Sequence, residues 1–146
     1  MKVGARIAHV NTYGRRVAAL IAVLEAKPGS TARPISAPRA RSPNAMIYYV
    51  CGKMFAILSL RGPEYVILKC DPALAELLRA KYTGVGHRSH LDKRFWVAVD
   101  LDADIPSKEI KRLVAHSYEL VCAGLTRKQQ AELAASTGSS KARKAG

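Results

Sequence analysis

The side chains best suited to chemistry in this sequence gather between residues 79 and 96. That stretch holds a single acid, Asp92, and leads into a predicted strand with two aromatic residues. Its basic residues are Arg79, Lys81, Arg88, Lys93 and Arg94, its histidines are His87 and His90, and the aromatic residues are Phe95 and Trp96. Cations that meet phosphates, beside a ring that meets bases, are what a nucleic-acid surface requires. In the plainer interpretation both rings belong to the core and the cations only solvate a loop.

The formal net charge of +13 is concentrated at the two ends of the 146-residue chain. Residues 1–45 carry a net +7 and residues 127–146 a net +4, which leaves +2 for residues 46–126. Each cation that meets a phosphate releases condensed counterions, so basic ends indicate arms that contact a polyanion. The alternative is that these tails only confer solubility.

Metal and nucleophile chemistry finds little support in the sequence. His87 and His90, three positions apart in a loop, could bind a metal together with His116, but the neighbouring cations oppose this, so we expect no metal site and no cofactor. Three cysteines are present: Cys51, Cys70 and Cys122. They form no C-x-x-C pair, and their odd number in a chain with an adequate core predicts free thiols in a reducing compartment. We therefore assign no catalytic residues.

Two further patterns resemble functional motifs. The segment from Gly84 to Gly86 begins like a phosphate-binding loop but follows a helix and lacks the third glycine, so we reject a dinucleotide site. Asp100, Asp102 and Asp104 could bind a hard cation, but a turn between strand and helix favours Asp for backbone reasons.

The elements that must position these residues begin with a helix from about residue 13 to 26. Residues 30–45 contain three prolines and three arginines. Prolines interrupt both helices and central strands, so we expect an extended, mobile connector. Residues 46–50, 53–60 and 64–69 then predict a three-stranded meander, and residues 94–101 a fourth strand. Apolar residues stand on both faces of these strands, so we expect the sheet to be covered.

Helix signals separate and follow the strands. Asp71 and Pro72 predict a helix start, and residues 83–91 a loop after that helix. The next predicted helix starts near Ser107 and ends at Gly124. Its predicted buried stripe consists of Ile110, Leu113, Val114, Ser117 and Val121. Thr126 and Gln129 have capping-box spacing for a last short helix to about residue 135.

This element order predicts an α+β fold, an antiparallel β-sheet with helices packed on it. We divide the chain into a basic N-terminal helix and connector (1–45), a folded domain (46–135) and a disordered basic tail (136–146). The longest apolar run, residues 17–24, is too short to span a membrane, and no convincing export signal follows it. We therefore expect a cytoplasmic protein without membrane contact, and favour a monomer.

Four motifs resemble the MmcQ/YjbR family of small bacterial proteins. They are residues 52–56 (GKMFA), residues 69–72 (KCDP), residues 90–93 (HLDK) with Trp96, and residues 117–121 (SYELV). The resemblance covers about residues 52–128. It implies an α+β fold of the CyaY/frataxin type and a DNA-binding role in which sheet and loops are compared to a double wing.

The resemblance also implies roles for individual residues. Lys53 and Lys69 stand at strand ends, His90 and Lys93 contact phosphate, and Trp96 stacks on a base or packs in the core. On the predicted helix from Ser107 to Gly124, Tyr118 buries its ring and forms a hydrogen bond to a backbone group through its hydroxyl.

We expect a small non-enzymatic nucleic-acid-binding protein, with DNA as partner, phosphate-dominated contacts and weak sequence preference. The binding residues we predict are Lys53, Lys69, Arg79, Lys81, Arg88, His90, Lys93, Arg94 and Trp96. The alternative is a module that binds a small molecule or a protein partner in a pocket between sheet and helices near Trp96 and Tyr118. A third hypothesis, a frataxin-like metal role, would use Asp100, Asp102, Asp104 and Glu109.

Overall fold

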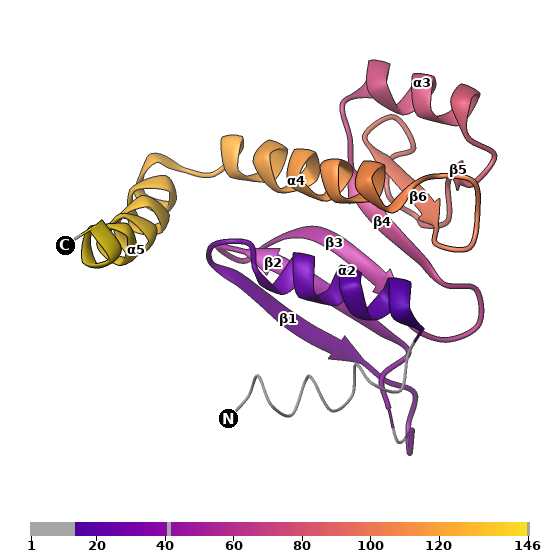
Figure 1. Ribbon diagram of the computed structural model, residues 1–146, viewed down its shortest axis with the longest axis horizontal. Helices are drawn as coiled ribbons and strands as arrows, with labels where there is room; N and C mark the ends of the chain where they lie inside the picture. The colour runs from indigo at the N-terminus through magenta and orange to yellow at the C-terminus, as the bar shows by residue number, and fades with distance from the viewer. Residues whose placement is uncertain (1–13, 41, 146) are drawn as a thin grey trace.

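The computed structural model describes residues 14–40 and 42–145, with residues 137–145 described as helix backbone only. The elements follow the order helix, four strands, helix, two strands and two helices (Figure 1). The helices are α2 (Arg15–Glu25), α3 (Pro72–Lys81), α4 (Ser107–Ala123) and α5 (Arg127–Ala145). The strands are β1 (Ser30–Ile35), β2 (Ala45–Val50), β3 (Lys53–Ser59), β4 (Tyr65–Lys69), β5 (Val85–Gly86) and β6 (Trp96–Asp100).

All six strands form one antiparallel sheet in the order β1-β2-β3-β4-β6-β5. The predicted meander is confirmed as β2, β3 and β4, and the fourth predicted strand is β6. A tight turn at Cys51 and Gly52, both with positive φ, joins β2 to β3. A turn with positive φ at both central residues matches the right-handed twist of the two strands it joins. Glycine adopts positive φ without strain because it has no Cβ atom.

The helices cover one face of the sheet, here called the helical face. Residues of α2, α3 and α4 join a single core cluster with strand residues, and Leu133 of α5 packs against it. The strand residues in that cluster include Tyr48, Ala56, Leu68 and Val97, which stand side by side across four strands. Figure 1 shows α2 and α4 lying across the strands. The predicted stripe of α4 is buried as expected.

The opposite face, here called the open face, carries no helix of the described chain. Its central row runs from Ile47 through Ile57 and Ile67 to Ala98, one residue from each of four adjacent strands. None of these four belongs to the core cluster or to the side chains packed against it. The expectation that the sheet is covered therefore holds for the helical face and for Ile67 and Ala98 on the open face, which are buried, while Ile47 and Ile57 are half-buried.

Local signals fix the ends of the helices as predicted. The carboxylate of Asp71 accepts hydrogen bonds from the backbone amides of Ala73 (3.1 Å) and Leu74 (3.3 Å), and Pro72 opens α3. Thr126 and Gln129 form a reciprocal capping box at α5, with both hydrogen bonds at 3.1 Å.

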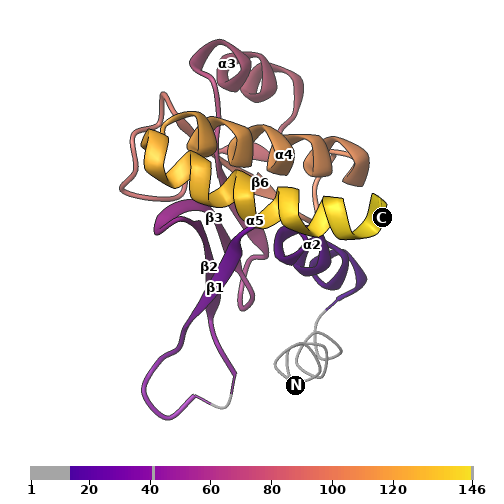
Figure 2. The same cartoon turned by 90° about the vertical axis from the view of Figure 1, so that its left-hand side faces the viewer.

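The structure differs from two predictions at the ends of the chain. Residues 30–35 are not part of a mobile connector, because β1 pairs along its whole length with β2. Pro34 is tolerated there because β1 is an edge strand with a ladder on one side only. The last predicted helix is longer than expected, because α5 continues beyond residue 135 to Ala145 into the segment predicted to be a disordered tail. In Figure 2 the loop between β1 and β2 extends away from the helices.

The predicted loop over residues 83–91 also contains the short strand β5, which pairs with β6 at the far edge of the sheet. Gly84 lies before it, and a Cβ atom there would stand 2.3 Å from Cβ of Ala103, so this close approach requires glycine. No helix of the described chain has the length and apolar character needed to cross a membrane.

Candidate nucleic-acid interface

Several predicted binding residues meet at one end of the sheet, here called the Lys69 end. Neighbouring strands are antiparallel, so the start of β3 (Lys53), the end of β4 (Lys69) and the start of β6 (Trp96) lie at the same end. Lys69 and Trp96 are direct partners in the ladder. The loop that carries Lys93 leads into β6 at this end. The fold thus joins residues that are up to 43 positions apart in sequence.

Arg79 reaches this end from α3 but is used to hold the loop. Its Nη2 atom donates to the carbonyl oxygens of Lys93 (2.5 Å) and Trp96 (3.1 Å). The guanidinium therefore fixes the backbone on both sides of the turn into β6, and its donors to those carbonyls are not available to phosphate. The structure thus gives Arg79 a role in positioning the loop, and its contact with phosphate stays a prediction.

Arg94 is also paired within the protein. Its guanidinium forms a salt bridge with Asp92 at 2.7 Å and lies 5.3 Å from the centre of the Phe95 ring. Hydrogen bonds from Arg94 lower the pKa of the Asp92 carboxyl to about 2. Both side chains are exposed, so a phosphate that takes Arg94 must compete with Asp92 in water.

Two predicted residues are turned away from the Lys69 end. The guanidinium of Arg88 pairs with Asp100 (3.2 Å) and lies 4.8 Å from the centre of the Tyr65 ring, where β4 begins. Lys81 lies over Tyr82 at the other end of α3, with its ammonium 5.3 Å from the ring centre. The stretch from residue 79 to 96 is therefore not one continuous basic patch, although the sequence suggested one.

The basic residues left for a ligand are three lysines, Lys53, Lys69 and Lys93, and one histidine, His90. None of these four forms an ion pair with an acidic group of the described residues. Lys53, Lys93 and His90 are exposed, and Lys69 is half-buried. Of the two acids at this end, Asp92 is paired with Arg94, and the Asp71 carboxylate caps the first amides of α3, so three lysines face one acid that has no cationic partner. The Lys69 end therefore keeps an uncompensated positive charge.

A groove of about 430 Å³ opens beside these lysines. It is lined by Lys69, Cys70, Asp71, Pro72, Phe95, Trp96 and Leu120. Phe95 is 39% exposed, which is unusual for a large apolar side chain, and Trp96 is half-buried. The core interpretation of these two rings is therefore incomplete, because both reach the groove. Burial raises the pKa of the Cys70 thiol to about 11, so this residue is a neutral, apolar part of the wall.

Ser117 of α4 supports the Lys69 end from the helical side; the sequence placed it in the buried stripe and in the family motif at residues 117–121, without naming a partner for its hydroxyl. Its hydroxyl donates to the carbonyl oxygen of Phe55 (2.6 Å) and accepts from the backbone amide of Lys69 (2.9 Å). This hydroxyl bridges β3 and β4 where their own ladder stops, next to the pair of Ala56 and Leu68. The sequence did contain a signal for this role: Ser117 interrupts an otherwise apolar helical stripe, and a buried hydroxyl requires a hydrogen-bond partner.

The aspartates after β6 serve the backbone. The carboxylate of Asp104 accepts hydrogen bonds from the amides of Thr83 (3.1 Å) and Gly84 (3.0 Å), which lowers its pKa. Asp100 pairs with Arg88. Within the described residues no group of three or more His, Cys, Asp or Glu side chains is arranged to hold a metal ion.

Among the described residues, Trp96 and Tyr118 line two separate grooves, whereas the alternative hypothesis placed one pocket near both. The Tyr118 hydroxyl donates to the carbonyl oxygen of Pro28 and its ring packs edge-on against Phe55, with 5.4 Å between centres, as the resemblance implied. Burial raises the pKa of Tyr118. Its groove, about 490 Å³, lies between α4 and α5.

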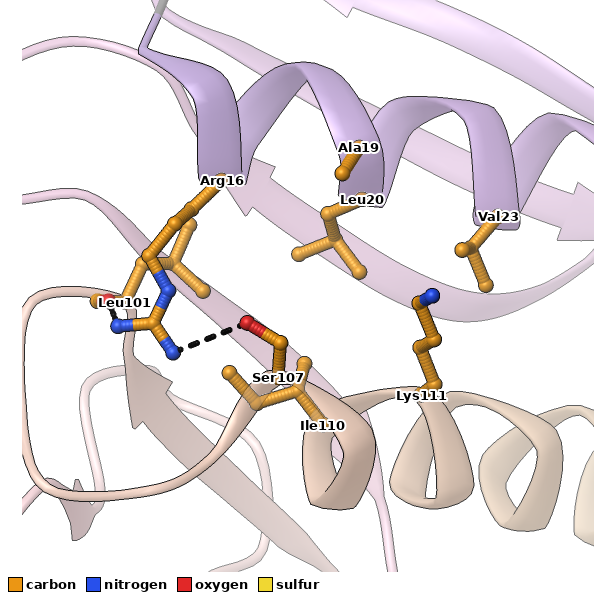
Figure 3. A pocket seen from close by; sticks show the side chains of 8 residues that line it. All are labelled: Arg16, Ala19, Leu20, Val23, Leu101, Ser107, Ile110 and Lys111. Carbon is orange, nitrogen blue, oxygen red and sulfur yellow. Dashed lines mark hydrogen bonds between the residues drawn. The ribbon is translucent and has the colours of Figure 1, made fainter.

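A third pocket lies between α2 and α4 and is small, about 30 Å³ (Figure 3). Arg16 closes one end, where its guanidinium donates to the carbonyl oxygens of Leu101 and Ile105 and to the Ser107 hydroxyl. This space holds one or two waters at most, so Arg16 fastens α2 to the start of α4.

Comparisons with known proteins agree with the fold. A YjbR family model matches residues 25–120. The uncharacterized protein YbdF of Escherichia coli O157:H7 is 29% identical over 89 residues, 60% of this chain and 73% of YbdF. The uncharacterized protein YjbR of Escherichia coli K12 is 44% identical over 54 residues, 37% of this chain and about half (46%) of YjbR.

Solved structures show the same architecture. The Deinococcus radiodurans protein DR2400, described with a DUF419 domain, superposes with a TM-score of 0.66 and 29% identity, over 78% of this chain and 84% of DR2400. A Pseudomonas syringae protein superposes with a TM-score of 0.57 over 73% of this chain and 97% of its own, and at 23% identity it supports the fold alone.

Proposed function

This chain belongs to the YjbR family, and we propose that it is a non-enzymatic protein that binds nucleic acid, DNA in particular, at the Lys69 end of its sheet. The observation that carries the proposal is the group of unpaired cations around an exposed aromatic groove. Lys53, Lys69 and Lys93 lack acidic partners among the described residues, while Phe95 and Trp96 line the groove beside them.

The proposal assigns different tasks to the predicted residues. Lys53, Lys69, Lys93 and His90 contact phosphate, and Trp96 meets a base. Arg79 holds the loop, and Arg94 contributes only when it leaves Asp92. Arg88 and Lys81 add a more distant positive field. The basic N-terminal residues 1–13 lie outside the described residues, and their proposed contact with phosphate rests on charge alone.

The proposal predicts binding that weakens steeply with salt. The test is fluorescence anisotropy of a labelled oligonucleotide at several salt concentrations, with the full chain and the double variant Lys69→Ala/Lys93→Ala. The slope of log affinity against log salt is negative, and loss of two phosphate contacts should make it shallower by about 1.4 to 1.8.

The matched control is Lys108→Ala/Lys111→Ala, which removes two exposed lysines from the first half of α4. This control carries the same net charge as the test variant. If both double variants weaken binding equally, net charge alone drives association and the Lys69 end is not the site. If the full chain does not bind at low salt, the nucleic-acid proposal fails.

A second candidate function rests on the groove itself. Its volume of about 430 Å³ falls within the usual range of small-molecule pockets, and its wall is mostly apolar. A small ligand of this groove would bind with little dependence on salt and would lose affinity in Phe95→Ala. That pattern separates this function from phosphate-dominated binding.

A further inference from the structure

The open face of the sheet is an apolar surface that the fold leaves without a helix. Ile47 and Ile57 are half-buried and Ile67 and Ala98 are buried, and none of the four belongs to the core cluster under the helices. The face continues toward the Lys69 end with two aromatic residues, Tyr49 on β2 and Trp96 on β6. Both are half-buried and outside the core cluster.

The two rings are separated by three strand spacings across the sheet, about 14 Å. This distance suits a chain of a few nucleotides that crosses the strands and lays bases on a flat surface. A third ring of this face, Tyr65, already carries a planar cation, the guanidinium of Arg88, at 4.8 Å. The face therefore presents rings to planar groups at both ends of β4.

The charge of this face identifies the occupant. The six strands contain a single acidic residue, Asp100, and Arg88 neutralises it. Arg33 on β1 and Lys69 on β4 stand on the same face and have no ion-pair partner among the described residues. A second copy of the chain would bring like charges together, whereas a polyanion complements them.

We infer that the open face, with Tyr49 and Trp96 at its Lys69 end, binds the unstacked bases of a single strand. The inference rests on the proposed function and specifies its ligand. In a duplex the bases are stacked and their faces are hidden, so a flat sheet reaches only phosphates there. A single strand offers base faces to the rings and phosphates to Arg33 and Lys69.

The test compares three labelled ligands with the full chain: oligo(dT), an abasic strand of the same length and charge, and a random duplex of the same length, which carries about twice that charge. Stacking of two bases should make oligo(dT) bind at least about tenfold more tightly than the abasic strand. Trp96 is the only tryptophan of the chain, so its fluorescence should be quenched by oligo(dT) and not by the abasic strand.

The variant Tyr49→Leu keeps an apolar side chain on the face and should lose about fivefold or more in affinity for oligo(dT), with abasic binding unchanged. Its control is Tyr82→Leu, a half-buried tyrosine that packs against the core on the helical side. Equal binding of dT and abasic strands without quenching would overturn the inference while leaving phosphate binding intact. Absence of binding to all three ligands would overturn the proposed function as well.

Discussion

Replacing Ser117 with alanine should destabilise the protein by about 3 kcal/mol. The hydroxyl is fully buried, donates to the carbonyl of Phe55 and accepts from the amide of Lys69. Its removal leaves two backbone groups without partners, and each buried unsatisfied group costs about 1–3 kcal/mol. For a chain of this size the loss corresponds to a fall in Tm of about 10 °C.

The assay is urea unfolding followed by circular dichroism, with Ser107→Ala as the control. Ser107 lies on the same helix but is exposed, and its hydroxyl accepts only one side-chain bond, from Arg16 at 3.3 Å. We expect the control to change stability by less than about 0.5 kcal/mol. A loss below about 1 kcal/mol in Ser117→Ala, with an unchanged urea slope, would refute the bridge between β3 and β4.

Three further predictions concern the loop and the groove. Arg79→Ala should destabilise by about 1–2 kcal/mol in urea, since two loop carbonyls lose a charged donor, and Arg79→Lys should restore only part of the loss. In an NMR pH titration, Asp92 should titrate near pH 2, so its contribution to stability is present above about pH 4 and fades as pH falls; Arg94→Ala should raise this pKa toward its ordinary value. Cys70 should resist iodoacetamide at pH 8 until the protein unfolds, because its pKa is about 11 and its side chain is buried.

Local signals in the sequence were sufficient for most helices and central strands. The cap at Asp71, the capping box at Thr126 and the apolar stripe of α4 act within a few residues, so they can be read without the fold. Strand β1 was missed because the three prolines of residues 30–45, of which Pro34 lies in β1, argued against a sheet. Only the position of β1 at the edge, where it pairs with β2 alone, makes Pro34 acceptable.

The candidate site was harder to predict than the fold. Charge along the sequence located the cations but not their partners, and Arg79, Arg88 and Arg94 prove to be engaged within the protein. The partners of these arginines lie between 2 and 17 positions away in sequence. Which partner each arginine meets depends on the direction of its side chain in the fold, which the sequence does not show. The pairing of Lys69 with Trp96 follows from strand register, which composition does not reveal.

The most direct test of the account is an amide NMR titration of the full chain with a short oligo(dT). We predict that the largest shift changes map to the Lys69 end and the open face, at Tyr49, Lys69, Lys93 and Trp96, and that the exposed side of α4 around Lys108 stays unchanged. Shift changes confined to the helical side, or none at low salt, would contradict the account.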